Sequence, residues 1–427
     1  MKKIIFSVLA VVAFVLSGCE GDQAVIVTDG TGGGQNNLIP RQITSNFELT
    51  NDRIWTIDGR TTVSNGAELL IQPGTIIKGN AGQGANASVL IIARGATINA
   101  NGTAAEPIVF TSAADNISIR QSAGTNLDQN DRGLWGGLII LGNAPGSFRG
   151  DVESVQIEGI PASDTNGLYG GSQAGDSSGI LNYVSIRHGG TNIGEGNEIN
   201  GLTLGGVGSG TTLSNIEVVA NVDDGIEFFG GTVSATNLFV WAVGDDSIDI
   251  DQAYSGTINN AGIVLGDISD HALEIDGREG SATGSFTIND ITLFGNTNTP
   301  NGEYADFRSR ATGSVNNVYA TGFKDSSDIE LDNNVVTQNY IDGDLSFSNW
   351  VLNVADDATA ASKFVEKVGC AQNCDDEDDS NDIDENPILG RPLSDDAASF
   401  SNAGTSGGAN TSAFAWTYSN TKAGLGF

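Results

Sequence analysis

Short runs of alternating apolar and polar residues, separated by Gly, Asn, Asp and Ser, fill most of the chain after residue 40. Examples are LLIQPGTIIKGN at 69–80, VLIIARGATINANGT at 89–103 and PIVFTSA at 107–113. A period of two is that of a β-strand, and an apolar pattern of period 3.6 is almost absent after residue 20. The pattern therefore predicts an all-β chain.

A repeat runs through the strand segments, and an asparagine marks each one. The segments read LNYVSI, LSNIEVV, ATNLFVW, INNAGIV, INDITLF, VNNVYAT and SFSNWVL, with Asn182, Asn215, Asn237, Asn260, Asn289, Asn317 and Asn349. Spacings of 22, 23, 29, 28 and 32 residues follow Asn215. An all-β repeat of this length indicates a solenoid, in which neighbouring coils bury one another. We expect the asparagines to stack at a turn and to hydrogen-bond from coil to coil.

Acidic residues recur at one place in this repeat, in VDDGIEFF (222–229), GDDSIDID (244–251) and SDHALEID (269–276). Side chains alternate along a strand, so stacking would align outward carboxylates into two columns. The first column would hold Glu227, Asp249 and Glu274, and the second would hold Asp251 and Asp276. ADFRS and DIELDN continue the columns with Asp306, Arg308, Glu330 and Asp332, and Thr203 precedes them by one coil.

Stacked carboxylates lie about 5 Å apart and repel by about 3 kcal/mol per pair at an effective dielectric constant near 20. Three interpretations of the columns stay open. They form a solvated acidic face, or a face bridged by cations such as Ca²⁺, or an active site. Glu227, Asp249, Asp251, Glu274 and Asp276 are the candidate metal ligands under the second interpretation.

The strings IQPGTIIKG, ARGATINANGTAAEPIVFTS and GLWGGLIILGNAP (133–145) resemble the opening coils of right-handed parallel β-helix proteins that bacteria export. The resemblance covers about residues 55–145 and implies a single-domain, right-handed parallel β-helix. We expect the β-helix to span 41–355. Residues 356–427 would form an acidic C-terminal loop, in which DDATAASKFVEKVG is a short helix and AFAWTYS (413–419) is a strand that caps the open end.

The strings VDDG, GDDS, SDHA and RSR resemble the successive active-site motifs of polygalacturonases, over about residues 222–310. The resemblance implies Asp246 as the general acid, Asp224 and Asp245 as the residues that activate water, His271 as the group that tunes the acid, and Arg308 with Arg310 as the grip on a substrate carboxylate. An inverting glycosidase needs its carboxyl groups about 6.5–9.5 Å apart. Such an enzyme would hydrolyse or otherwise degrade an acidic polysaccharide.

The first residues, MKKIIFSVLAVVAFVLSGC, combine two lysines, a short apolar run and a small-residue site. This is the pattern of an export signal, and the apolar run is too short to span a membrane. The Leu-Ser-Gly-Cys ending resembles the lipobox of bacterial lipoproteins, which implies cleavage after residue 18 and a lipid on Cys19. A plain signal peptide is the alternative. We expect a flexible tether at 19–40, a lipid anchor as the membrane contact, and a place in the bacterial cell envelope at the outer membrane.

The formal net charge of −34 excludes nucleic acid as a natural partner and suits a protein that meets divalent cations. In an oxidising compartment, Cys370 and Cys374 in CAQNC predict a local disulfide. Only two histidines occur in the chain, which makes a zinc site a poor fit. The sequence thus predicts a glycan-binding or adhesion surface, with Ca²⁺ as the candidate cofactor. The alternatives are a polysaccharide-degrading enzyme and a purely structural surface protein.

Overall fold

The computed structural model describes residues 37–193, 199–308, 310–367, 388, 399–402 and 407–427. The chain divides into two compact units, 1–35 and 36–427, and every described residue belongs to the second unit. Cys19, most of the tether, Cys370 and Cys374 lie outside the described residues, so the lipid anchor and the disulfide stay predictions. Among the described residues, no helix has the length and apolar character needed to cross a membrane.

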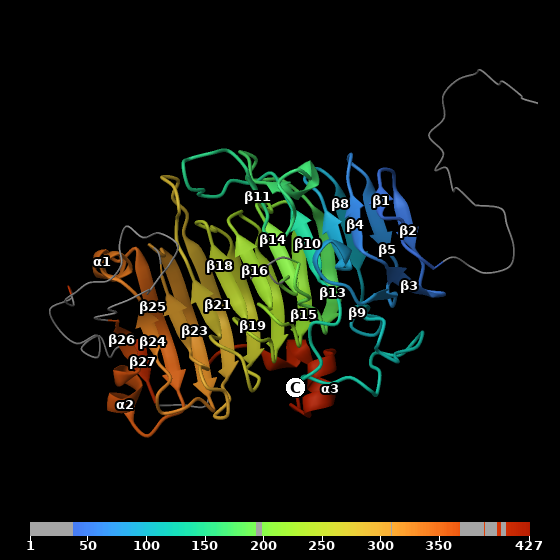
Figure 1. Cartoon of the computed structure of the whole chain (residues 1–427). Helices are drawn as coiled ribbons and strands as arrows, with labels where there is room; N and C mark the ends of the chain where they lie inside the picture. The colour runs from blue at the N-terminus through green and yellow to red at the C-terminus, as the bar shows by residue number, and fades with distance from the viewer. Residues whose placement is uncertain (1–36, 194–198, 309, 368–387, 389–398, 403–406) are drawn as a thin grey trace, which may run out of the picture. The chain divides into compact units, whose positions relative to one another are not determined.

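Two long sheets of parallel strands form the second unit, with the strands stacked coil upon coil (Figure 1). The short-strand sheet has eleven strands in the order β1 (Gln42–Ile43), β4 (Arg60–Val63), β7 (Val89–Ile92), β10 (Leu138–Leu141), β14 (Leu202–Gly205), β16 (Ile226–Phe229), β18 (Ile248–Asp251), β20 (Leu273–Ile275), β22 (Ala305–Phe307), β24 (Ile329–Leu331) and β26 (Phe364–Glu366). Each coil therefore adds one strand beside the equivalent strand of the coil before it. This topology confirms the predicted parallel β-helix.

The second sheet, with fourteen strands, bends between two faces of each coil. It contains β2 (Phe47–Leu49), β5 (Glu68–Ile71), β8 (Thr97–Asn101), β13 (Gly179–Arg187), β15 (Thr212–Val219), β17 (Ala235–Trp241), β19 (Thr257–Val264), β21 (Phe286–Phe294), β23 (Gly313–Thr321), β25 (Leu345–Leu352), β27 (Phe400–Ser401), β3 (Ile54–Ile57), β6 (Ile76–Gly79) and β9 (Ile108–Ser112). The first half of β13 pairs with β8 and its second half with β9. One long strand thus replaces two short ones and turns a corner between them.

The asparagine ladder forms this corner. Asn215, Asn237 and Asn260 have φ angles of 52°, 60° and 63°, a left-handed conformation that Asn tolerates better than most residues. The side-chain amide of Asn237 donates to Asn215 at 2.9 Å, and that of Asn260 donates to Asn237 at 2.7 Å. The predicted bonding from coil to coil is confirmed. Asn182 and Asn289 lie one residue before the corner. In their coils the left-handed residues are Tyr183 and Asp290.

The core lies inside the coils, and alternate residues of the short-strand sheet point away from it. In β10, Leu138 and Ile140 join the central core, whereas Ile139 and Leu141 belong to a separate outer cluster. That cluster is completed by an insertion between β10 and β13, which carries β11 (Val155–Gln156), η2 (Thr165–Gly167) and β12 (Leu168–Tyr169). The insertion therefore covers the outer face of the sheet near its N-terminal end.

The C-terminal part departs from one prediction. The helix expected after residue 355 is present as α2 (Asp357–Ser362), and α1 (Asn334–Asp342) lies before β25. The segment expected to be a capping strand instead contains η4 (Thr411–Phe414) and the start of α3 (Tyr418–Ala423). Phe414 and Tyr418 are spaced by one helical turn and pack with Phe239 and Trp241. The segment lies against the side of β17, so the prediction of an end cap formed by a strand was wrong.

Candidate functional site

The acidic column exists with the predicted register. Thr203 pairs with Glu227, Glu227 with Asp249, Asp249 with Glu274, Glu274 with Asp306, and Asp306 with Glu330. The column is not a freely solvated face, because Glu227, Asp249 and Asp306 are only 5%, 8% and 5% exposed. Desolvation therefore adds to the mutual repulsion of these carboxylates.

A pocket of about 330 Å³ opens over β16, β18 and β20. It brings together all five predicted metal ligands and both predicted substrate-gripping arginines. The lining residues are Arg149, Glu158, Glu227, Phe229, Asp249, Asp251, Gln252, Glu274, Asp276, Gly277, Arg278, Glu279, Arg308 and Arg310. Acidic and guanidinium side chains thus face one cavity.

Basic side chains compensate the C-terminal part of the column. Arg308 pairs with Glu274, and its Nε lies 3.7 Å from an oxygen of Asp276. Further along, the Lys367 ammonium lies 2.8 Å from Glu330 and 3.0 Å from Asp332. Burial lowers the pKa of Lys367, but the Glu330 and Asp332 carboxylates outweigh burial and hold that pKa above its usual range. Positively charged side chains of the protein thus offset the repulsion between the carboxylates in these coils.

The N-terminal end of the column has a different environment. Asp224, Glu227 and Asp249 are all buried, and each offers an oxygen within 4.8 Å of the others. Burial, and then the neighbouring carboxylates, raise the pKa of each of the three well above its usual range. One oxygen of Asp249 and the amide oxygen of nearby Asn200 are buried without a hydrogen-bond partner. Several hard oxygen donors around one point are the ligand set that Ca²⁺ prefers.

Asn200 belongs to this group through Glu227, because its side-chain amide donates to a Glu227 oxygen. The bond orients the carboxylate and leaves the Asn200 carbonyl oxygen as a further potential ligand. A buried polar atom without a partner costs free energy, so each such atom needs an explanation. A divalent cation that coordinates both oxygens would explain why neither has a hydrogen-bond partner.

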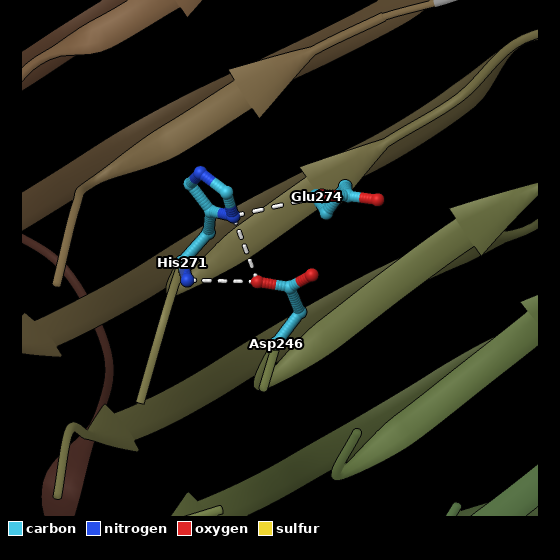
Figure 2. A group of neighbouring side chains, drawn as sticks. All are labelled: Asp246, His271 and Glu274. Carbon is cyan, nitrogen blue, oxygen red and sulfur yellow. Dashed lines mark hydrogen bonds and ion pairs between the residues drawn. The ribbon is translucent and has the colours of Figure 1, made fainter. Parts of the chain in front are cut away.

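The predicted catalytic aspartates and His271 lie just before the same strands, whereas Arg308 and Arg310 follow β22. Figure 2 shows Asp246 beside His271, with Glu274 nearby. One oxygen of Asp246 accepts the backbone N–H of His271 at 2.7 Å and lies 2.9 Å from the ring Nδ1. Burial lowers the pKa of His271, but Asp246 outweighs it and holds that pKa well above its usual range. Asp246 thus favours the protonated form of His271.

This pairing does not suit the role of general acid, which the resemblance to polygalacturonases implies for Asp246. Burial raises the pKa of Asp246, but the hydrogen bond and charge of His271 outweigh burial and hold that pKa below its usual value. A general acid near neutral pH needs a raised pKa instead. Asp245 has one, since desolvation by its neighbours and the charge of Asp246 raise its pKa to about 7, although the residue itself is exposed at the surface.

Asp224 is also used structurally, because one of its oxygens accepts the backbone N–H of Asp246 at 2.9 Å. Asp224 and Asp246 thus make the same bond to the next coil. Oxygens of Asp223, Asp224 and Asp245 also lie within 4.8 Å of one another.

Sequence reasoning missed several pocket residues. Arg149 and Glu158 come from the insertion before β13, and Gln252 and Glu279 come from the turns after β18 and β20. None of the four falls on the repeating strand positions. The one available signal was the Gly-rich stretch at 166–179, which indicates a loop that leaves the coils.

Comparison with known proteins yields one family. Neither the comparison with curated proteins nor the comparison with solved structures finds a match. The family described as pectate-lyase like beta helix domain matches residues 41–387. Together with the parallel sheets, this match agrees with the predicted all-β, right-handed parallel β-helix. The chain belongs to the family of pectate-lyase-like β-helix domains.

Proposed function

We propose that this protein binds an acidic polysaccharide at the pocket over β16, β18 and β20, in a manner that depends on Ca²⁺. The observation that carries the proposal is the pocket itself, in which a close group of carboxylates adjoins arginine side chains. Family membership supports a polysaccharide-related function at the family level.

The carboxylates of Asp224, Glu227 and Asp249 would hold the cation. Ca²⁺ takes six to eight oxygen ligands, so three carboxylates leave positions for carboxylates of the glycan. The cation would also lower, at the pocket, the repulsion that a chain of charge −34 exerts on a polyanion.

Arginine side chains provide the second part of the binding site. Arg278 and Arg310 line the pocket together with Arg308. Arg308 is engaged with Glu274 and Asp276, so its main task is to hold these acids in place. The guanidinium groups of Arg278 and Arg310 would bind a uronate carboxylate, which matches the planar fork of arginine.

The test is a binding measurement with the chain from residue 24. Polygalacturonate, alginate and a neutral glucan are offered in Ca²⁺ and in EDTA. We expect the two acidic glycans to bind in Ca²⁺ only, and the neutral glucan not to bind. Equal binding in EDTA would contradict the role of the cation. Absence of binding to every acidic glycan would contradict the proposed function and favour a structural surface protein.

A second candidate function is degradation of the polysaccharide by hydrolysis or elimination. The observation that favours it is the place of Asp245, whose pKa is raised to about 7, next to Asp246, which contacts His271 at 2.9 Å. A carboxyl group of that pKa suits proton transfer near neutral pH. Release of new reducing ends, lost in both Asp245→Asn and Asp246→Asn, would establish it. Binding without product would leave the chain a binding protein.

We also propose that a lipid on Cys19 tethers the protein to the cell envelope. The support is the sequence at the N-terminus alone. In cells, Cys19→Ser should move the protein from the membrane fraction to the periplasmic fraction. An unchanged membrane fraction in Cys19→Ser would contradict the anchor.

A further inference from the structure

The outward face of the short-strand sheet changes character along the stack. Ile91 pairs with Ile139, Ile139 with Thr203, and Thr203 with Glu227, all in one outward register. The register is therefore apolar through β7 and β10 and acidic from β16 onward. Thr203, which is 2% exposed, stands at the boundary. Among β7, β10, β14 and β16, this outward register carries a carboxylate only at Glu227 of β16.

The insertion between β10 and β13 occupies the apolar side. Phe148, Ile157, Ile160 and Tyr169 pack onto the sheet, in one cluster with Ile91, Ile139 and Leu141. The Tyr169 ring also lies 5.5 Å from Phe148 and 6.0 Å from Phe229. Because these side chains are buried, the face of β7 and β10 has no room for a glycan.

The insertion is tied to the rim of the pocket. The Tyr169 hydroxyl donates to Gln252 at 2.8 Å, and the backbone N–H of Arg149 donates to Glu279 at 3.2 Å. The Gln252 amide in turn donates to Glu279 at 2.9 Å. Arg149, Gln252 and Glu279 all line the pocket. The insertion and the turns after β18 and β20 therefore form a joined wall.

From this wall we infer that the pocket receives the end of an acidic glycan chain and not an internal stretch. The inference rests on the proposed function. A chain that enters from the acidic coils cannot run on past Glu227 toward β10, because the insertion fills that face. The wall formed with Gln252 and Glu279 closes a second side. Arg149 and Glu158, which the insertion contributes to the pocket, would contact the terminal sugar.

The experiment measures how many protein molecules bind each chain of a long, size-fractionated polygalacturonate in Ca²⁺. End binding predicts one protein per chain whatever the chain length. It also predicts that partial cleavage of the polymer increases the amount of protein bound per mass of polymer, in proportion to the number of new chain ends. A stoichiometry that grows with chain length would overturn the inference but leave the proposed function standing. No binding to any length in Ca²⁺ would overturn both.

Variants that loosen the insertion test the wall directly. Tyr169→Phe keeps the ring and removes the bond to Gln252, whereas Phe148→Ala removes packing under the insertion. We expect Phe148→Ala to raise the number of proteins bound per long chain at least twofold, with a smaller rise for Tyr169→Phe. Asp52→Asn, in an exposed turn of an early coil, is the matched control and should bind one per chain. If Phe148→Ala still binds and still shows one protein molecule per long chain, the insertion does not limit binding to chain ends.

Discussion

His271 and Asp246 are joined across neighbouring coils by a single carboxylate oxygen, which accepts the His271 backbone N–H at 2.7 Å and meets its ring Nδ1 at 2.9 Å. Asp224 repeats the backbone part of this bond to Asp246 at 2.9 Å. The aspartates before these strands thus connect one coil to the next. Their spacing in the sequence has a structural cause, whatever chemistry they also perform.

Asp246→Asn should lower the free energy of unfolding by about 2 kcal/mol, since the buried bonds to His271 lose the charge of their acceptor. The contribution of His271 is complete below its unfolded pKa of 6.5 and is lost as pH rises through its higher folded pKa. The contribution of Asp246 is present above its unfolded pKa of 3.8 and is lost as pH falls through its lower folded pKa. Urea unfolding at acidic, neutral and alkaline pH measures both.

The double variant Asp246→Asn, His271→Gln is the control for that prediction. If the two side chains stabilise each other, the double variant should lose less than the two single losses combined. Strict additivity at neutral pH would show that the pair is not coupled.

Asp249→Asn should stabilise the protein in EDTA and abolish its stabilisation by Ca²⁺. Burial raises the folded pKa of Asp249, so its contribution to stability falls as pH rises from 3.8 through that folded pKa. Ca²⁺ at a hundredfold its Kd should stabilise the wild type by about 2.7 kcal/mol. Thermal unfolding in Ca²⁺ and EDTA checks both effects. Asp52→Asn should respond as the wild type does, and a retained Ca²⁺ response in Asp249→Asn would exclude this carboxylate as a ligand.

Arg308→Gln should destabilise the protein, because Glu274 and Asp276 lose their basic partner. Breaking a fully buried ion pair costs about 3–5 kcal/mol, and the partial exposure of this one reduces the expected loss to about 2 kcal/mol. Adding Glu274→Gln should recover most of the loss, because it removes one stranded acid. Chemical unfolding of the two variants provides the measurement. A double variant less stable than Arg308→Gln would show that Glu274 stabilises the fold independently.

Glu217→Ala should detach the C-terminal segment from β15. Glu217 is fully buried and accepts the Ser419 backbone N–H at 2.7 Å and its hydroxyl at 2.6 Å. It also lies 4.0 Å from the buried Arg187, whose charge would lose its partner at a cost of about 3–5 kcal/mol. Limited proteolysis should then cut within 407–427. Ser419→Ala, which loses one hydroxyl bond, should cost about 1 kcal/mol and leave the segment resistant.

The repeat made much of this fold predictable. Stacking turns a period in the sequence into a column in space, so the register from Thr203 to Glu330 followed from alignment of the coils alone. The burial of the column did not follow, because it depends on contacts with the insertion, which stands outside the repeat, whereas Arg308 occupies a position that the alignment of the coils had already placed in the columns. For the same reason the low pKa of Asp246 was hidden, since it depends on a contact between coils.

The C-terminal segment shows a second limit. Its aromatic residues suggested a strand by composition, yet their spacing of one helical turn places Phe414 and Tyr418 together on Phe239 and Trp241. Such a short segment takes its conformation from the surface it packs on, and the sequence does not reveal that surface.

Calorimetric titration of trigalacturonate into the wild-type chain, in Ca²⁺ and in EDTA, tests the central proposal most directly. Because coupling between two ligands is reciprocal, Ca²⁺ should tighten glycan binding by the same factor by which the glycan tightens Ca²⁺ binding. We predict at least a tenfold effect in both directions, lost in Asp249→Asn. Glycan affinity that is equal in Ca²⁺ and EDTA, or no binding heat in either, would contradict a cation-dependent glycan site.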